Sequence, residues 1–220
     1  MNARKITFEM SMEGRQLDET IAGIFHTVMF HRSCGKFTYN NEESYSIRTL
    51  SYLDIDCDFV NFTYVCCESA ALDRSLRQEI ADFSEQMRAA EHVSTPTHGS
   101  ISLEFYQRKR ARWPFQPECV PWEVWTVCCE LGDPDEFNPH NHHENVVETL
   151  QEKIVYVTEL INKHEYVPKM PSRSDVDLIF DTSFPDIQPY LFKIHYSLAG
   201  CTSTNVGNTV RKLIRDTLAL

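Results

Sequence analysis

The residues best suited to chemistry in this chain are its histidines and cysteines. The run His140-Asn141-His142-His143 follows the pair Cys128-Cys129 at loop distance. Imidazole nitrogens and thiolates are the ligands that zinc prefers in proteins, so a zinc site would combine this run with one of the two thiols. The spacing matches no standard zinc signature. We therefore predict no metal, and expect a solvated polar loop with a histidine at the entry of a helix.

A cysteine nucleophile activated by a histidine is the second chemistry that these residue types allow. The chain has eight cysteines, but no local family signature surrounds any of them. It also contains no glycine-rich phosphate loop, no Gly-x-Ser-x-Gly motif and no His-Glu-x-x-His motif. Buried structural thiols are the simpler interpretation. We expect no enzyme and no cofactor, with a Cys/His metal-binding or thiol-dependent enzyme as the alternative.

A third feature suits recognition better than catalysis. The tripeptide Trp113-Pro114-Phe115 lies between two stretches with strand character, where a hairpin would normally have a polar turn. Pro114 fixes its own φ and pushes Trp113 toward extended geometry, so the two rings are held apart on a stiff backbone. Such a tip either packs on the protein's own sheet or is buried by a partner, because aromatic side chains anchor interface hot spots.

A basic cluster comes directly before this tip, made of Arg108, Lys109, Arg110 and Arg112. Charge runs of this kind are commonly the solvated arm of a hairpin. The cluster can also steer the tip toward an acidic patch on a partner, because opposite charges accelerate encounter. The sequence leaves both interpretations open.

Hydrophobic periodicity predicts the elements that position these residues, in the order strand, helix, strands, helix, hairpin, helix, strand. The predicted strands cover residues 4–12, 45–53, 59–66, 101–105, 123–130 and 190–198. Apolar helix faces occur at 17–28, 72–87 and 147–161, and residues 206–218 fit a last helix or a strand. Hairpin connections and clustered strands favour an antiparallel α+β sheet with helices on one face, in one domain.

Single residues predict how some of these elements end or pack. Gly35 suits the left-handed position after the first helix, and Ser69 suits the N-cap of the second. The stretch Phe59–Val65 is β-branched and aromatic on both faces, which is typical of a central strand.

Composition excludes several classes of partner. The formal net charge is −11, from 32 acidic and 21 basic residues. Nucleic acid and anionic membranes both reward clustered Lys and Arg, so neither is expected as the main partner. No segment approaches the roughly 20 apolar residues that span a bilayer, and no apolar run of signal-peptide length follows the N-terminus. We expect a cytosolic or nuclear protein with reduced thiols and no direct membrane insertion.

Long sequence blocks along the chain are similar to a known family. The most specific are Arg112-Trp113-Pro114-Phe115 and Pro121-Trp122-Glu123-Val124-Trp125-Thr126-Val127. Others are Glu13–Gln16, Asp56–Phe59, His164–Pro171, Gln188–Leu191 and Lys212–Leu220. In these blocks the chain resembles the autophagy-related protein 101 family from end to end.

The resemblance implies a single HORMA domain over residues 1–220, in which three main helices pack on an antiparallel sheet. It implies a protruding finger loop at 108–121 and a C-terminal safety-belt region from about residue 168 to 220. The stretch Cys128–His143 departs from the family pattern in length and in Cys and His content, so partner choice or self-association near the start of the long helix can differ here.

The resemblance also implies a non-enzymatic adaptor subunit of the autophagy-initiation kinase complex. Such a protein pairs with and stabilises the HORMA domain of autophagy-related protein 13. It recruits downstream autophagy factors through the finger, which by motif match is Trp113, Pro114 and Phe115. The implied location is the cytoplasm, with the preautophagosomal structure during autophagy. A homodimer that exposes two fingers is a further alternative.

Overall fold

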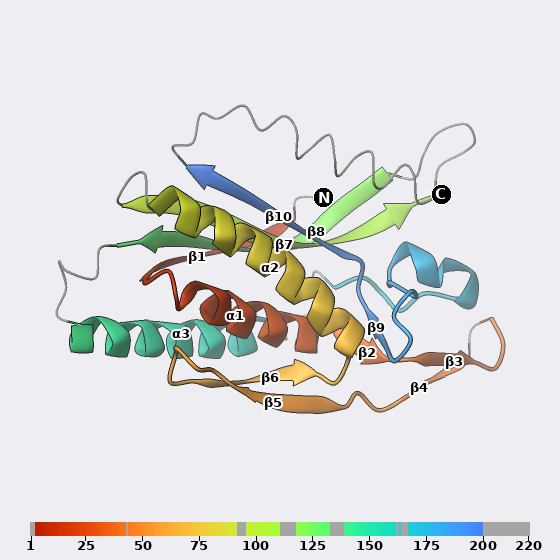
Figure 1. The fold of residues 1–220 in the computed structure, drawn as a ribbon. Coiled ribbons are helices and arrows are strands. Elements are labelled where there is room, and N and C mark those ends of the chain that lie inside the picture. Colours follow the sequence, from red (N-terminus) through yellow and green to blue (C-terminus); the bar gives the residue numbers. More distant parts are fainter. Residues whose placement is uncertain are drawn as a thin grey trace.

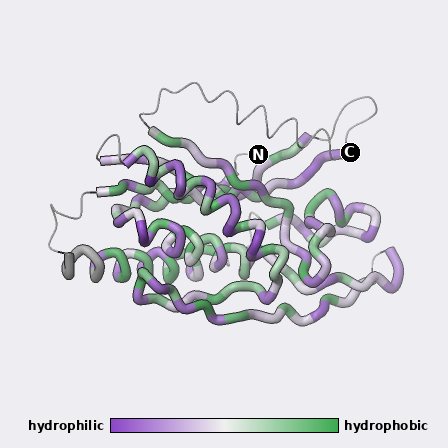
Figure 2. The backbone as a smooth tube through the Cα atoms, in the orientation of Figure 1, coloured by the Kyte–Doolittle hydropathy of each residue, from purple (hydrophilic) through white to green (hydrophobic). Residues whose placement is uncertain are grey.

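Alternating apolar and polar side chains build the main sheet. A computed structural model describes residues 3–42, 44–91, 96–110, 118–132, 139–161, 163 and 167–199. Its largest sheet contains β1 (Arg4–Met12), β7 (Thr97–Lys109), β8 (Glu118–Leu131) and β10 (Phe192–Ala199), in the order β1-β8-β7-β10. Figure 2 shows hydrophobic and hydrophilic residues alternating along these strands, which gives the sheet one apolar face.

Three long helices cover that apolar face (Figure 1). They are α1 (Leu17–His31), α2 (Ala70–Glu91) and α3 (Pro139–Ile161). α1 contacts α2, α3 and a small strand pair, and most of its side chains are buried as a result. The core gathers large side chains from sheet and helices, including Trp125, Phe105, Phe25 and Phe83. Among the described helices, none is long and apolar enough to cross a membrane.

Three two-stranded sheets complete the described fold. β2 (Ser33–Gly35) pairs with β9 (Ile187–Pro189), and β3 (Phe37–Tyr39) pairs with β4 (Tyr45–Ile47). β5 (Tyr52–Asp56) pairs with β6 (Thr63–Cys67), which packs against α1. A 3-10 helix, η2 (Arg173–Leu178), lies between α3 and β9.

The predicted fold class is confirmed: the protein is α+β, with a sheet of several strands and three main helices, consistent with a HORMA-like domain. The sheet is not wholly antiparallel, because β1 pairs with β8 in parallel while β7 pairs with β8 and β10 antiparallel. Ser69 caps α2 as predicted, since its Oγ accepts the backbone N–H of Leu72 at 3.3 Å. The tail after residue 199 lies outside the described residues.

Three local predictions are wrong. The predicted strand 45–53 is divided between β4 and β5, which belong to different two-stranded sheets. Gly35 does not end the first helix, which stops at His31; it lies in β2, where a Cβ would meet the carbonyl oxygen of Arg48 at 1.9 Å. The stretch Phe59–Val65 is not a central strand, because β6 begins at Thr63 and pairs only with β5 among the described strands. Apolar residues in this stretch have two different environments. Those of β6 pack against α1, whereas Phe59 lies in an exposed loop.

Candidate partner-binding surfaces

The predicted finger residues Trp113, Pro114 and Phe115, and Arg112 of the basic cluster, lie outside the described residues. The structure does describe what carries them. Beyond Phe105 and Glu123, β7 and β8 have no other partner strand among the described strands, since β10 begins opposite Phe105 and β1 begins opposite Glu123. One backbone hydrogen bond, from Tyr106 N–H to the Leu191 carbonyl at 3.0 Å, ties the first residue of this stretch to the segment before β10. Residues 106–109 and 118–121 therefore form a two-stranded extension of the sheet, which we call the arm (Figure 1).

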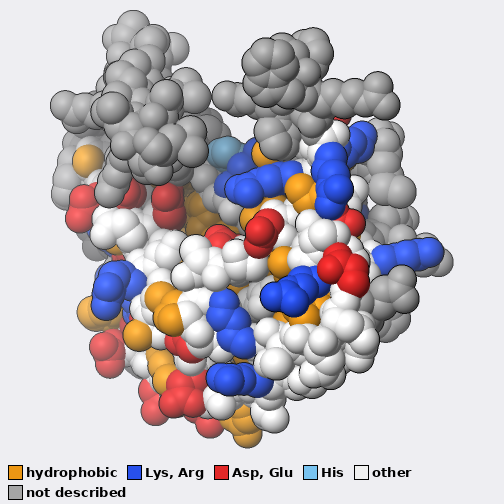
Figure 3. Space-filling model, turned by 90° about the vertical axis from the view of Figure 1, so that its right-hand side faces the viewer, with side chains coloured by type: hydrophobic (Ala, Val, Ile, Leu, Met, Phe, Trp, Pro, Cys, Tyr) orange, Lys and Arg blue, Asp and Glu red, His pale blue; other side chains and the backbone are white. Residues whose placement is uncertain are grey.

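The described members of the basic cluster lie at the end of this arm. Arg110 forms an ion pair with Asp175 of η2 and donates a hydrogen bond to the Ser174 carbonyl at 3.2 Å. Lys109 faces Glu118 across the arm at 3.8 Å, with both side chains exposed. Arg108 is also exposed. Figure 3 looks onto this end of the molecule, where Lys and Arg side chains gather although the chain is acidic overall.

Three of the thiols are in environments that suppress ionisation. Burial raises the pKa of Cys57 and Cys67 to about 11 and that of Cys129 to about 12. A thiolate is the species that attacks substrates and binds zinc, so these three groups are poor candidates for either task. No cluster of three or more metal-ligating side chains occurs in the described part of the chain, and the side chains of the run 140–143 lie outside it.

The outer face of α3 is the first exposed apolar surface. Val155 and Tyr156 are 56% and 47% exposed. They line an open groove of about 490 Å³, together with Glu148, Gln151, Glu152 and Glu159. The Tyr156 ring lies edge-on to Phe8 of β1, with ring centroids 6.0 Å apart, so it is fixed in place over the edge of the sheet. This face of α3 therefore presents two exposed apolar side chains among glutamates.

β5 and the loop after it carry a second group of exposed apolar side chains, on both sides of the strand. Tyr52, Leu53 and Phe59 are between 46% and 60% exposed. The Glu19 carboxylate accepts hydrogen bonds from the backbone N–H groups of residues 58, 59 and 60 at 2.7 to 2.9 Å. This contact with α1 fixes the loop in a conformation that leaves Phe59 in solvent.

The same helix, α1, packs against the elements that support both groups of exposed side chains. A Cβ on Gly23 of α1 would lie 3.8 Å from the Tyr64 ring of β6 and 3.9 Å from Leu150 of α3. These are ordinary van der Waals distances, so β6 and α3 both pack against α1 at this point. Acidic side chains flank both apolar surfaces, with Asp54 and Asp56 on β5 and three glutamates on α3. Together they favour a partner with apolar and basic side chains.

Periodicity correctly predicts the inner face of α3 but does not reveal this groove. Leu150, Val157 and Ile161 are buried as the helical spacing indicates. Val155 and Tyr156 are apolar residues outside the stripe that faces the core. Their position on the helix was the feature of the sequence that could have indicated an exposed apolar surface. Tyr52 and Leu53 are adjacent in β5 and must face opposite sides of the strand, so alternation alone does not show that both are exposed.

Comparisons with known proteins agree with the resemblance seen in the sequence. The family model for autophagy-related protein 101 matches residues 9–174. The chain is 47% identical over 221 residues to autophagy-related protein 101 of Xenopus tropicalis and of Homo sapiens, with 100% of both chains covered. It is 22% identical over 182 residues to the Arabidopsis thaliana protein of that name, covering 73% of this chain and 77% of that protein. The chain belongs to the autophagy-related protein 101 family.

Proposed function

We propose that this chain is a non-enzymatic adaptor subunit of the autophagy-initiation kinase complex. It pairs with and stabilises the HORMA domain of autophagy-related protein 13. It recruits downstream autophagy factors through Trp113, Pro114 and Phe115, in the cytoplasm and at the preautophagosomal structure. The chain acts as a single HORMA domain over residues 1–220, whose residues from about 168 form the safety belt.

The observation that carries the proposal is the exposed apolar groove of α3 in a member of this family. A side chain such as Tyr156, 47% exposed and fixed by Phe8, is costly to leave in water unless something covers it. The second group, Tyr52, Leu53 and Phe59, lies on β5 and on the loop that the Glu19 carboxylate of α1 holds. We assign these two surfaces to the pairing with the other HORMA domain.

The arm supports the recruiting role. It extends past the last paired residues of the neighbouring strands β1 and β10, and the finger residues come directly between its two strands in the sequence. Arg110 is paired with Asp175 and so anchors the arm, which leaves Arg108 as the better candidate for steering a partner. Burying the two aromatic rings of the finger would contribute roughly 3–6 kcal/mol before entropic costs.

Replacing both finger aromatics separates recruitment from folding. Trp113→Ala with Phe115→Ala is expected to change the free energy of unfolding by less than about 1 kcal/mol, as exposed substitutions usually do. Recruitment of downstream factors to autophagosome formation sites, counted by fluorescence microscopy in cells, should fall. Co-purification with the HORMA domain of autophagy-related protein 13 should persist. Unfolding of the double variant would make the tip part of the core and remove the main support for recruitment.

Light scattering of the purified chain, with and without reductant, separates a monomer from a homodimer. A constitutive homodimer that blocks pairing with the other HORMA domain would contradict the adaptor role in its present form. A monomer in both conditions agrees with it.

A further inference from the structure

A β-bulge marks the point where the arm leaves the sheet. Phe105 pairs with Glu123, but Tyr106 pairs with Pro121, so Trp122 is the extra residue on β8. A bulge bends its strand and redirects the residues beyond it. The direction of the arm therefore depends on how Trp122 is held.

Packing alone holds the Trp122 ring within the described structure. Its centroid lies 5.6 Å from the ring of Phe105 and 5.3 Å from that of Tyr190, and the Arg32 guanidinium lies 5.6 Å from it. Trp122 Nε1 is buried without a hydrogen-bond partner among the described residues. Since no hydrogen bond fixes the indole, its orientation follows from the position of these neighbours.

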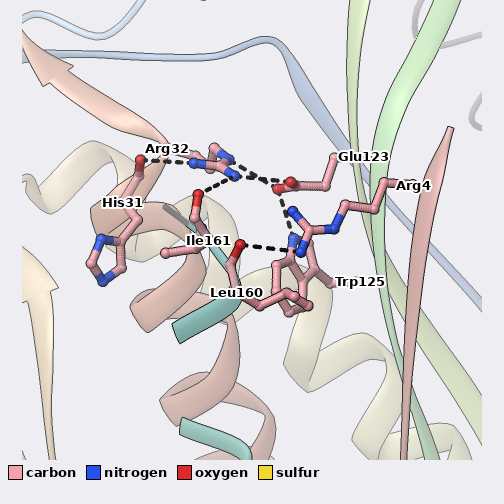
Figure 4. Close-up of polar contacts among 7 residues, drawn as sticks. All are labelled: Arg4, His31, Arg32, Glu123, Trp125, Leu160 and Ile161. Carbon is pink, nitrogen blue, oxygen red and sulfur yellow. Dashed lines mark hydrogen bonds and ion pairs between the residues drawn. The ribbon is translucent and has the colours of Figure 1, made fainter. Parts of the chain in front are cut away.

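Arg32 is itself fixed by a buried ion pair next to the bulge (Figure 4). Its Nε donates to Glu123 Oε1 and its Nη2 to Glu123 Oε2, both at 2.9 Å. Trp125 Nε1 donates to Glu123 Oε1 at 2.8 Å. Glu123 is fully buried and Arg32 is 4% exposed. This two-point contact fixes the plane of the guanidinium as well as its position.

The same arginine reaches the C-terminal end of α3. Arg32 Nη2 also donates to the Ile161 carbonyl at 3.1 Å, and Arg4 Nη2 donates to the Leu160 carbonyl at 3.1 Å (Figure 4). The last carbonyls of a helix have no partner within the helix and carry partial negative charge, so two arginines suit this end. Arg32 therefore connects the bulge with the helix that carries the apolar groove.

We propose that Arg32, Trp122 and Glu123 are positioning residues that set the direction of the arm and tie it to the end of α3. The proposal rests on the proposed recruiting function of the finger. A buried ion pair is seldom required for stability alone, because apolar residues of similar volume often replace it without loss. Apolar replacements of Arg32 and Glu123 could not form the contacts that fix Glu123, the Ile161 carbonyl and the indole face of Trp122 relative to one another.

Hydrogen exchange of the full chain tests this directly. The variant Arg32→Met with Glu123→Gln removes both charges and keeps an acceptor for Trp125. Its melting temperature should stay within about 5 °C of the wild type. Backbone amides of residues 106–109 and 118–120 should exchange about ten times faster, while those of α2 and of the β1–β8 pairing stay unchanged. Recruitment of downstream factors should fall although Trp113 and Phe115 are intact.

A control removes a partly buried ion pair at another site. Arg88 Nη1 lies 2.6 Å from Asp18 Oδ2 between α2 and α1, and Arg88→Met with Asp18→Asn should leave the arm amides unchanged. If the first variant does not fold, Arg32→Lys keeps the charge but cannot form the fork, and arm exchange should still accelerate.

Three results would overturn the proposal: unchanged arm amides, equal acceleration throughout the sheet, or a loosened arm with normal recruitment. The exchange measurement needs no partner. Normal recruitment by Trp113→Ala with Phe115→Ala would instead contradict the proposed function of the finger.

Discussion

Asp73 joins the first two helices through a histidine. His26 is buried in α1, and its Nε2 lies 3.4 Å from Asp73 Oδ1 at the start of α2. Arg77, one turn further along α2, approaches the same oxygen at 2.8 Å. The contact with His26, followed by that with Arg77, holds the pKa of the Asp73 carboxyl below its ordinary value of 3.8. The ionised carboxylate is therefore favoured by folding.

This pKa predicts an acid-dependent part of stability. Because the pKa is lower in the folded than in the unfolded chain, the contribution of Asp73 is complete above about pH 3.8 and is lost as the pH falls toward the folded pKa. Asp73→Asn should lower the free energy of unfolding by about 0.5 kcal/mol at pH 6, a value kept small by solvent screening. Urea denaturation at pH 6 and pH 3 measures it. A difference between the two proteins that does not shrink at pH 3 would contradict this interpretation.

Where two backbone segments lie in close contact, a glycine cannot be replaced by a residue with a side chain without a backbone shift. A Cβ at position 35 would lie 1.9 Å from the Arg48 carbonyl oxygen, where β2 passes the end of β4. We expect Gly35→Ala to lower the free energy of unfolding by about 3 kcal/mol, since backbone must shift. Gly132 has no described atom within 4 Å of its Cβ position, so Gly132→Ala is a matched control with an expected change below about 1 kcal/mol. Chemical denaturation measures the free energy of unfolding of both variants. Equal values for Gly35→Ala and Gly132→Ala would contradict the close backbone contact at β2.

The elements that the sequence predicts best are those whose apolar residues face one side. β1, α2 and α3 follow their periodicity closely, and Trp125 and Val127 are buried on the face of β8 that alternation indicates. Prediction fails where packing comes from elements distant in sequence. Gly35 meets Arg48, and β6 packs on α1, which local pattern does not show.

The candidate site was predicted only in part, for the same reason. The sequence indicates the arm and its basic residues, and the structure pairs Arg110 with Asp175, 65 positions further along the chain. The Arg32–Glu123 pair joins positions 91 apart and gives no local signal. The groove of α3 requires knowing which helix face the sheet leaves uncovered, which is a property of the assembled fold.

In the whole molecule, the two candidate binding regions lie on different elements of the fold. The arm extends the sheet at one end of β7 and β8, while α3 and β5 present apolar side chains among carboxylates. α1 supports both, since its residues pack under α3 and β6 and Arg32, directly after its end, contacts Glu123 at the base of the arm. An adaptor needs this arrangement, because it must hold one partner while it presents a binding element to another.

Binding of the purified HORMA domain of autophagy-related protein 13, measured by calorimetry, tests this account most directly. Val155→Asp with Tyr156→Asp adds charge to an already acidic groove, and should weaken binding at least about tenfold. Met170→Asp changes another exposed apolar residue and should leave the affinity unchanged, as should Trp113→Ala with Phe115→Ala. Wild-type affinity in the groove variant would contradict the assignment of α3 as the surface that pairs with the other HORMA domain.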